Sequence, residues 1–214
     1  RRLYATGLFT DVDVADESVA GGVALTIRVR ERQRIQGVVF VGNRKLDEAA
    51  LKLKITVADG QLLDASVLEL DARKIAGAYA DDGYARARVT AKTNATAPGV
   101  VGVKFEIVEG SKQKVRGIEI HGTTTVPPSE LAGAMKSQTP GFLKSGTYKP
   151  SKLEDDMTAL RLHMRSRGYR DAEVDSIRPA ETADGKGVVL HTYVREGPRY
   201  RFGAMSWLGN TAVP

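Results

Sequence analysis

Three histidines are the side chains of this sequence best suited to bind a metal or to transfer a proton near neutral pH: His121, His163 and His191. No pair of them has the i, i+4 spacing by which one helix presents two imidazoles to a metal. The 214-residue chain contains no cysteine, which excludes disulfides, thiolate catalysis and cysteine-bound metals. We therefore expect the histidines to be surface or packing residues, with no metal and no cofactor bound.

Acidic residues occur in runs that could pair two carboxylates for acid–base catalysis. The runs are Asp81-Asp82 and residues 154–156, and both fall at the ends of expected helices. Acids in a first helical turn favour the helix dipole, and nothing in the pattern brings the two runs into a common cleft. Gly21-Gly22 joins two expected strands, not a strand and a helix, so it does not predict a phosphate-binding loop. The sequence therefore does not predict an enzyme.

Basic residues exceed acidic ones and give the chain a formal net charge of +6. They are interleaved with Asp and Glu along the whole chain, which favours a solvated surface over a nucleic-acid site. Two sets alternate along expected strands, namely Lys112, Lys114 and Arg116, and the arginines at every second position over residues 28–34. Such alternation is typical of a solvated strand face, and it also suits contact with an anionic membrane surface or an acidic partner.

The elements that must position these side chains form an internal repeat. Residues 66–89 read as an amphipathic helix, a glycine stop at Gly83 and a strand. The apolar face of this helix consists of Leu68, Ala72, Ile75 and Tyr79. Adding 85 to the residue numbers finds a second copy of the segment, with Leu153, Met157, Leu160, Met164 and Gly168. A truncated third copy opens the chain at residues 3–12.

A strand that ends in glycine recurs in the same order. Its copies are residues 34–43 (RIQGVVFVGN), 114–123 (KVRGIEIHGT) and 201–210 (RFGAMSWLGN), whose closing glycines are 80 and 87 residues apart. Each copy places two apolar side chains on one face of the strand. Two signatures that recur in one order predict a repeat architecture.

Each repeat shows the order β-α-α-β-β, which predicts an α+β fold of tandem modules. If the first and last strands lie side by side, each module is a three-stranded mixed sheet with two helices on one face. We expect complete modules at residues 32–110 and 111–198, the C-terminal part of a first module at 1–31, and the start of a further module at 199–214. Because the chain starts inside an expected helix, we expect it to be cut from a longer protein. No apolar run reaches the roughly 18 residues of a membrane-spanning helix.

Local features refine this prediction. A short helix is expected over Asp47–Val57, and a turn over Asn94–Gly99. Pro127-Pro128 is expected to open the first helix of the 111–198 module, where a missing N–H does no harm. Ser151, three residues before Glu154, predicts a capping box at the next helix.

The order of these elements resembles the POTRA domain, the polypeptide-transport-associated repeat found in front of outer-membrane β-barrels. The resemblance rests on the helix-Gly-Tyr-strand element, on the strand ending in Gly-Asn or Gly-Thr, and on Glu109-Gly110 and Glu196-Gly197 between modules. The segments LYATGLFTDVDV and GFLKSGTYKPSKLEDDM resemble parts of the POTRA array in outer-membrane assembly factors of the BamA family. Glu31-Arg32, at the end of the first module, departs from the Glu-Gly pattern.

The resemblance implies a non-enzymatic periplasmic region of an outer-membrane β-barrel assembly factor, located at the periplasmic face of the outer membrane. Its implied partners are unfolded outer-membrane protein precursors, accessory assembly lipoproteins and a C-terminal β-barrel of the same protein. The same architecture fits a related translocation barrel, of the TamA-like or two-partner secretion type. A periplasmic enzyme or metal-binding protein is a remote alternative that rests on the scattered histidines and acids.

The expected topology leaves the middle strand of each module at a sheet edge, where it can pair with an unfolded chain through main-chain hydrogen bonds. The outward side chains of these edges are the candidate contacts: Arg86, Arg88, Thr90, Lys92, Glu173, Asp175 and Ile177. Outward charges equally serve to discourage indiscriminate edge pairing.

A second candidate contact is the insertion at Thr139–Lys149, which has no counterpart of equal length in the preceding module. Its apolar side chains, Phe142, Leu143 and Tyr148, are expected to form an exposed protein-binding cluster. Alternatively, they fold back onto the helices of their own module.

Overall fold

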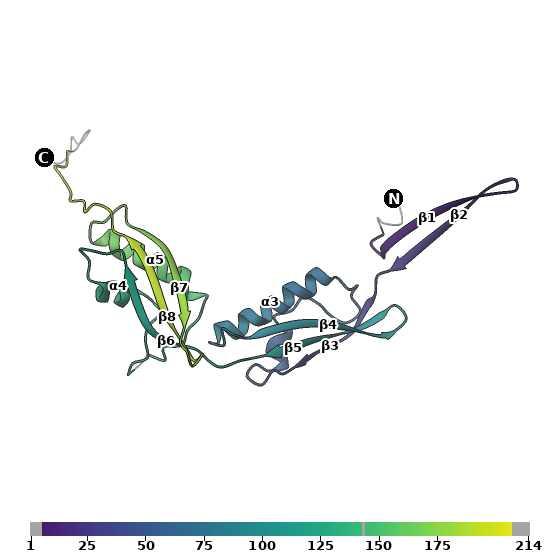
Figure 1. Ribbon diagram of the computed structural model, residues 1–214, viewed down its shortest axis with the longest axis horizontal. Coiled ribbons are helices and arrows are strands. Elements are labelled where there is room, and N and C mark those ends of the chain that lie inside the picture. Colours follow the sequence, from purple (N-terminus) through teal and green to yellow (C-terminus); the bar gives the residue numbers. More distant parts are fainter. Residues whose placement is uncertain (1–5, 143, 207–214) are drawn as a thin grey trace, which may run out of the picture. The chain divides into compact units, whose positions relative to one another are not determined.

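The computed structural model describes residues 6–142 and 144–206. In this part of the chain the fold divides into two compact units (Figure 1). One unit comprises the residues up to Tyr79 together with Arg86–Gly110, and the other comprises Ala80–Ala85 together with the residues from Ser111 onward. Both units contain the predicted β-α-α-β-β order, which we call the second module (β3 to β5) and the third module (β6 to β8).

The sheet of the second module contains β3 (Arg34–Val41), β5 (Val100–Val108) and β4 (Arg88–Ala97), in the order β3-β5-β4. β3 runs parallel to β5, and β4 runs antiparallel to it. The predicted mixed sheet is therefore confirmed, and β4, the middle strand of the sequence, lies at an edge. The strand extends beyond the predicted turn at Asn94, since pairing with β5 continues to Ala97.

The third module repeats this sheet with β6 (Lys114–His121), β8 (Gly187–Arg195) and β7 (Glu173–Glu181), in the order β6-β8-β7. β6 is parallel to β8 and β7 is antiparallel to it. The edge position predicted for the middle strand is confirmed here as well, because β7 pairs with β8 alone among the described strands.

Helices cover one face of each sheet, as the apolar periodicity predicts (Figure 1). In the second module these are α2 (Glu48–Lys52) and α3 (Ala65–Asp81), and in the third α4 (Pro128–Ala134) and α5 (Lys152–Ser166). The predicted stripe of α3 is buried in full: Leu68, Ala72, Ile75 and Tyr79. Gly83 and Gly168, which follow the two long helices, have φ angles of +96° and +93°, where glycine avoids the steric cost of a Cβ.

Two expectations about helix ends are wrong. α2 is shorter than Asp47–Val57, because the N–H groups of Thr56 and Val57 bond the side chain of Asp71 instead of continuing a helix. Ser151 makes no capping hydrogen bond, since its own backbone is already helical and an N-cap side chain requires an extended backbone at that residue. Pro127-Pro128 does open α4, as predicted.

Buried carboxylates recur in the two modules and hold their loops. Asp71 accepts the two N–H groups just named at 2.6 and 2.9 Å, and Asp156, 85 residues later, accepts those of Lys136 and Ser137 at 2.6 and 3.0 Å. Burial raises the pKa of Asp71, but the bonds from Val57, Lys74 and Thr56 together hold it below its ordinary value. The folded chain therefore stabilises the ionised form of Asp71.

A second carboxylate recurs in each module, directly after the last strand of its sheet. Glu109 accepts the N–H groups of Arg44 and Lys45 and the hydroxyl of Tyr79, at 2.6, 2.7 and 2.9 Å. Glu196 does the same for the loop after β6, with N–H donors from three consecutive residues, Thr124, Thr125 and Val126. The Glu of each Glu-Gly dipeptide thus ties the last strand of a module to the loop after the first.

Residues outside the two modules form less structure. β1 (Phe9–Val19) and β2 (Gly22–Glu31) are an antiparallel hairpin, as predicted. Residues 199–206 form neither helix nor strand, and the rest of the strand expected at 201–210 lies outside the described residues, as does most of the helix end expected at 1–7. In the described part of the chain, no helix combines the length and the apolar character needed to cross a membrane.

Candidate protein-binding edges and loop

The β4 edge presents a row of polar side chains to solvent. Arg88, Thr90 and Lys92 are exposed, while the intervening Val89 and Ala91 are half-buried toward α3, as the alternation predicts. Arg86 precedes the strand and lies in a turn, so it is not part of the ladder. Pairing with β5 runs without a register shift from Arg88 to Ala95.

Charge on the second sheet's outer face is balanced next to this edge. Glu106 of β5 lies 2.7 Å from the ammonium of Lys104 and 2.6 Å from that of Lys92. Hydrogen bonds from Lys104 and Lys92 lower the pKa of Glu106 to about 2. Lys92 is therefore paired with a carboxylate of its own sheet. Arg88 is the other basic residue of the exposed row on β4.

A groove of about 370 Å³ lies between the β4 edge and α3. Its lining combines small apolar side chains with a threonine of β4 and with a glutamate and an arginine of α3. The lining residues are Glu69, Ala72, Arg73, Ala76, Val89, Thr90 and Ala91. An extended segment added beside β4 would direct every second side chain into this groove.

The β7 edge differs from the β4 edge because its ladder is interrupted. The register shifts between Val174 and Ser176, so the strand carries a bulge at Asp175. The bulge reverses the alternation beyond it, and Ile177, expected to face outward, is 9% exposed and packs in the core. The expectation for Ile177 is therefore wrong, whereas Glu173 and Asp175 are exposed as predicted.

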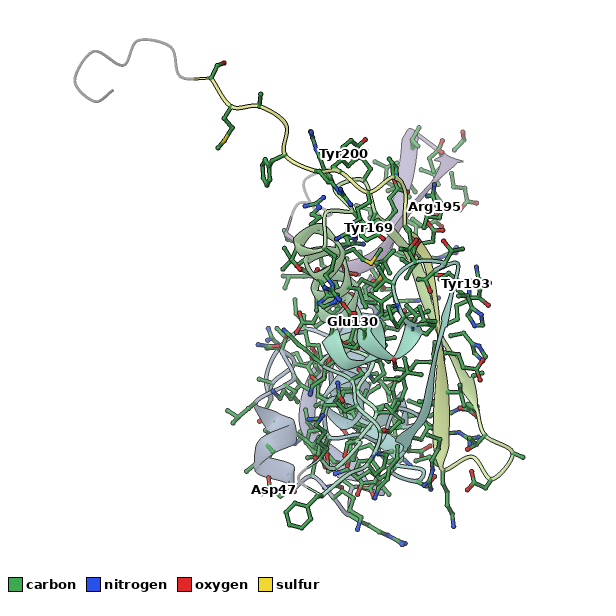
Figure 2. All side chains as sticks on the ribbon, turned by 90° about the vertical axis from the view of Figure 1, so that its left-hand side faces the viewer. Asp47, Glu130, Tyr169, Tyr193, Arg195 and Tyr200 are labelled. Atoms are coloured by element: carbon green, nitrogen blue, oxygen red, sulfur yellow. The ribbon has the colours of Figure 1, made fainter. Side chains whose placement is uncertain are left out.

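Both acids of the β7 edge are bound by a residue of the neighbouring strand. Arg195 of β8 pairs with the carboxylate of Glu173 and contacts Asp175 at 2.9 Å. The bond from Arg195 lowers the pKa of Asp175. Tyr193 and Arg195 lie along β8 on the side away from α4 (Figure 2). Pro179 further along β7 has no N–H to offer a partner strand.

The insertion divides into an exposed tip and a buried base. Phe142 is fully exposed, as predicted, and Leu143 lies outside the described residues. Tyr148, expected to be exposed, is 5% exposed and belongs to the core, because the insertion folds back along β6. The N–H of Val115 donates to Gly146 and that of Tyr148 to Gln113, at 2.7 and 2.9 Å. Burial raises the pKa of the Tyr148 phenol.

The structure also brings together residues that sequence spacing kept apart. His121 and His191 meet on the outer face of the third sheet, where Nε2 of His121 lies 3.2 Å from Nδ1 of His191, with Glu119 beside both. His163 is separate from them and contacts Glu130 at 2.7 Å. The i, i+4 spacing of a helix does not reveal this cluster. Glu119 and His121 lie two residues apart on β6, and His191 lies opposite Glu119 on β8.

Comparisons with known proteins place these modules in a family. The POTRA family model, described as surface antigen variable number repeat, matches residues 33–110 and 113–197. The chain is 33% identical over 194 residues to a protein of Treponema pallidum (strain Nichols) provisionally named as an outer membrane protein assembly factor, with 88% of this chain and 23% of that protein covered. It is 26% identical over 214 residues to the outer membrane protein assembly factor BamA of Nitratidesulfovibrio vulgaris Hildenborough, with 98% and 27% covered.

The chain therefore spans about a quarter of the length of these relatives. Among solved structures, it resembles the crystal structure of Haemophilus influenzae BamA POTRA3-5, with a TM-score of 0.55 and 20% identity over 86% of this chain and 74% of that one. At that identity the likeness concerns the fold alone. Since the family model matches most of the chain, the chain belongs to the POTRA family, and its modules are POTRA domains of the BamA-family type.

Proposed function

We propose that this chain is the periplasmic POTRA region of an outer-membrane β-barrel assembly factor. It docks accessory assembly lipoproteins and guides unfolded outer-membrane proteins by strand addition, ahead of their insertion by a C-terminal barrel of the same protein. The family and the names of its relatives support this assignment. The observation that carries the mechanism is the open β4 edge with its groove against α3.

Strand addition suits a substrate that is unfolded and destined to become β-strands. Such a chain offers unpaired N–H and C=O groups whatever its sequence, and an edge strand bonds them with little demand on side chains. β4 has a regular register over Arg88–Ala95, so an outward N–H and C=O pair recurs at every second residue. The groove lined by Ala72, Ala76 and Ala91 has room for side chains of varied size.

The β7 edge supports this function less well than β4. Its bulge, its proline and its arginine-bound acids are the devices by which proteins protect an edge from pairing. We therefore assign substrate pairing to β4, with Arg88, Thr90 and Lys92 bordering the added strand. Glu173 and Asp175 of β7 then serve to prevent unwanted pairing of the third module.

The tip of the insertion is our candidate contact for an accessory protein. Phe142 is fully exposed on a loop that has no equal in the second module, and a bulky aromatic group in water is the usual centre of a protein interface. The base of the loop around Tyr148 is structural and takes no part in this contact.

Proline substitution tests the β4 assignment. Consecutive residues of an edge strand direct their N–H groups to opposite sides, so one of Thr90→Pro and Ala91→Pro removes a bond to β5 and the other removes an outward donor. The variant that keeps its circular dichroism spectrum should bind fluorescent peptides from outer-membrane barrel strands about tenfold more weakly, the equivalent of one hydrogen bond. Ala76→Phe, which fills the groove, should weaken binding without altering the edge backbone.

The matched control is Glu173→Pro at the β7 edge, which should leave peptide binding unchanged. If the folded proline variant of β4 and Ala76→Phe both bind the peptides as the parent does, β4 is not the docking site. If Glu173→Pro alone weakens binding, the substrate pairs with β7 and our assignment of the two edges is reversed.

A further inference from the structure

Glu119, His121 and His191 form a cluster on the outer face of the third sheet that the proposed function does not use. Glu119 and His121 are two residues apart on β6, so their side chains leave the same face of the strand. In the parallel pairing of β6 with β8, Glu119 lies opposite His191, and His121 lies opposite Tyr193. Three potential metal donors from two adjacent strands therefore meet on one surface.

The donor atoms are already spaced as they would be around a small cation. Nε2 of His121 and Oε2 of Glu119 each lie 3.2 Å from Nδ1 of His191, and they lie 3.9 Å from each other. Ligands bound at about 2.0–2.2 Å to a tetrahedral Zn²⁺ are roughly 3.3–3.6 Å apart. Small side-chain adjustments would bring all three donors to bonding distance of one ion.

Ring packing holds the imidazoles in this arrangement. The ring of His121 stacks on that of Tyr193, with centroids 4.9 Å apart, and on that of His191 at 5.5 Å. Tyr193 is in turn covered by the guanidinium of Arg178 at 5.2 Å. Because these contacts restrict the rings before any ion arrives, binding would cost less conformational entropy than at a pair of free surface histidines.

The second module shows that the fold does not require these residues. The equivalent pairs across β3 and β5 are Val39 opposite Lys104 and Val41 opposite Glu106. Valine binds no metal, and the carboxylate of Glu106 is engaged by two lysines. The His-His-Glu set is therefore a property of the third module and not of the repeat.

We propose that Glu119, His121 and His191 form a Zn²⁺ site on the outer face of the third module. Two imidazoles and one carboxylate are the ligand set of zinc sites that keep an open position. All three side chains are partly exposed, so the remaining position is accessible to water or to a histidine or carboxylate of a partner. A proton carried by Nε2 of His121 or by Nδ1 of His191 has to leave that nitrogen, by moving to the other nitrogen of the same ring, before both facing nitrogens can bind one ion.

Isothermal titration of the untagged 214-residue chain with ZnCl₂ tests the proposal. One equivalent of Zn²⁺ should bind, and MgCl₂ should give no comparable signal, because Mg²⁺ prefers all-oxygen sites. His121→Gln and His191→Gln should each weaken Zn²⁺ binding by at least roughly 10- to 100-fold. That is the loss seen when a residue that only hydrogen-bonds a metal ligand is removed, and here a ligand itself is removed. Glu119→Gln should weaken it less, since two imidazoles remain.

The control variant is His163→Gln, which removes the histidine bound to Glu130 and should leave the titration unchanged. Circular dichroism and thermal unfolding without metal establish that each variant is folded, and Zn²⁺ should raise the melting temperature of the parent but not of the His191 variant. Absence of stoichiometric binding by the parent overturns the proposal. So does binding that His121→Gln and His191→Gln leave intact.

Discussion

The second and third modules share one architecture and differ on their surfaces. The positions that recur are those in contact with the backbone of another segment. They are a glycine after the first strand, an aspartate in the long helix and a glutamate after the last strand. These pairs are Gly42 and Gly122, Asp71 and Asp156, and Glu109 and Glu196. The outer face and the edge strand do not recur. The repeated positions thus hold the fold, and the contacts that we propose for binding lie at positions that differ.

The glutamate after the last strand accepts a hydroxyl hydrogen bond in both modules, but the donor residue differs. In the second module, the hydroxyl of Tyr79 donates to Glu109. Adding 85 to Tyr79 leads to Met164, which has no such donor, and there the hydroxyl of Thr124 donates to Glu196 at 3.0 Å. The acceptor keeps its full set of bonds although the donor comes from another element, as expected for a buried carboxylate that must be satisfied.

The largest matched effect is expected from alanine at the two closing glycines. A Cβ at Gly42 would lie 2.1 Å from the carbonyl oxygen of Ile107, and one at Gly122 would lie 2.1 Å from that of Val194. Both glycines also have positive φ angles, of +93° and +86°. Each alanine should lower the free energy of unfolding of its own module by about 3 kcal/mol.

Hydrogen-exchange mass spectrometry of the whole chain can follow peptides of α3 and α5 separately and so assign each loss to its module. Gly42→Ala should increase exchange in α3, and Gly122→Ala should increase it in α5. A large loss at one glycine with none at the other would show that the two modules do not share this constraint.

A smaller and unequal effect is expected at the buried aspartates. Asp71 uses both oxygens, since Oδ1 contacts the ammonium of Lys74 at 2.9 Å. Asp156 bonds its two N–H donors through Oδ1, and within the described residues its Oδ2 has no hydrogen-bond partner. Alanine should therefore lower the free energy of unfolding by about 2 kcal/mol at Asp71 and by about 1 kcal/mol at Asp156.

The residue that produces this inequality can be transplanted. Position 159, equivalent to Lys74, is alanine, so Ala159→Lys would give Asp156 the cation that Asp71 already has. This variant should stabilise the third module in urea unfolding and increase the loss caused by Asp156→Ala. Equal losses at Asp71 and Asp156 in the original chain would contradict the comparison.

The sequence predicts the architecture well because the signals of the fold are local and repeated. The buried face of α3, the glycine at its end and the alternation of β5 each need only a few consecutive residues. Two of the errors arise where a distant group competes. Asp71 bonds the N–H groups of Thr56 and Val57, which therefore do not continue a helix, and pairing of β6 with the insertion buries Tyr148. Neither contact is visible in the periodicity of its own segment.

The candidate sites were predicted less completely, because they too depend on contacts between segments that are distant in the sequence. Period-two alternation places Arg88, Thr90 and Lys92 correctly, but a single bulge at Asp175 turns Ile177 into the core. The meeting of His121 with His191 depends on the parallel register of two strands 70 residues apart. The alternation of Glu119 and His121 on one strand was available in the sequence, and only the register supplies the third member.

The smallest expected effect is the pH dependence that comes from an ion pair between helices, which the third module has and the second lacks. Arg167 of the segment after α5 and His163 of α5 both bond Glu130 of α4 and lower its pKa to about 2. A carboxyl group whose pKa is lower in the folded than in the unfolded chain stabilises the fold above its unfolded pKa of about 4.5, and this contribution is lost as the pH falls toward 2. Glu130→Gln should therefore reduce urea stability of the third module slightly at pH 7, and the difference from the parent should shrink between pH 5 and pH 2.

The second module supplies the control, because Glu106, its carboxylate with a pKa of about 2, lies on the sheet and not between helices. Residues 50 and 82, equivalent to Glu130 and Arg167, are alanine and aspartate, so no corresponding pair links its helices. Hydrogen exchange in α3 should thus be the same in the parent and in Glu130→Gln at every pH, while that in α4 and α5 should differ above about pH 5 and converge toward pH 2. Because all three partners are partly exposed, added salt should reduce the difference further, as screening weakens ion pairs in contact with water. A difference that persists unchanged at pH 2 would mean that glutamine disturbs the packing of α4, and that the ion pair is not what distinguishes the two modules here.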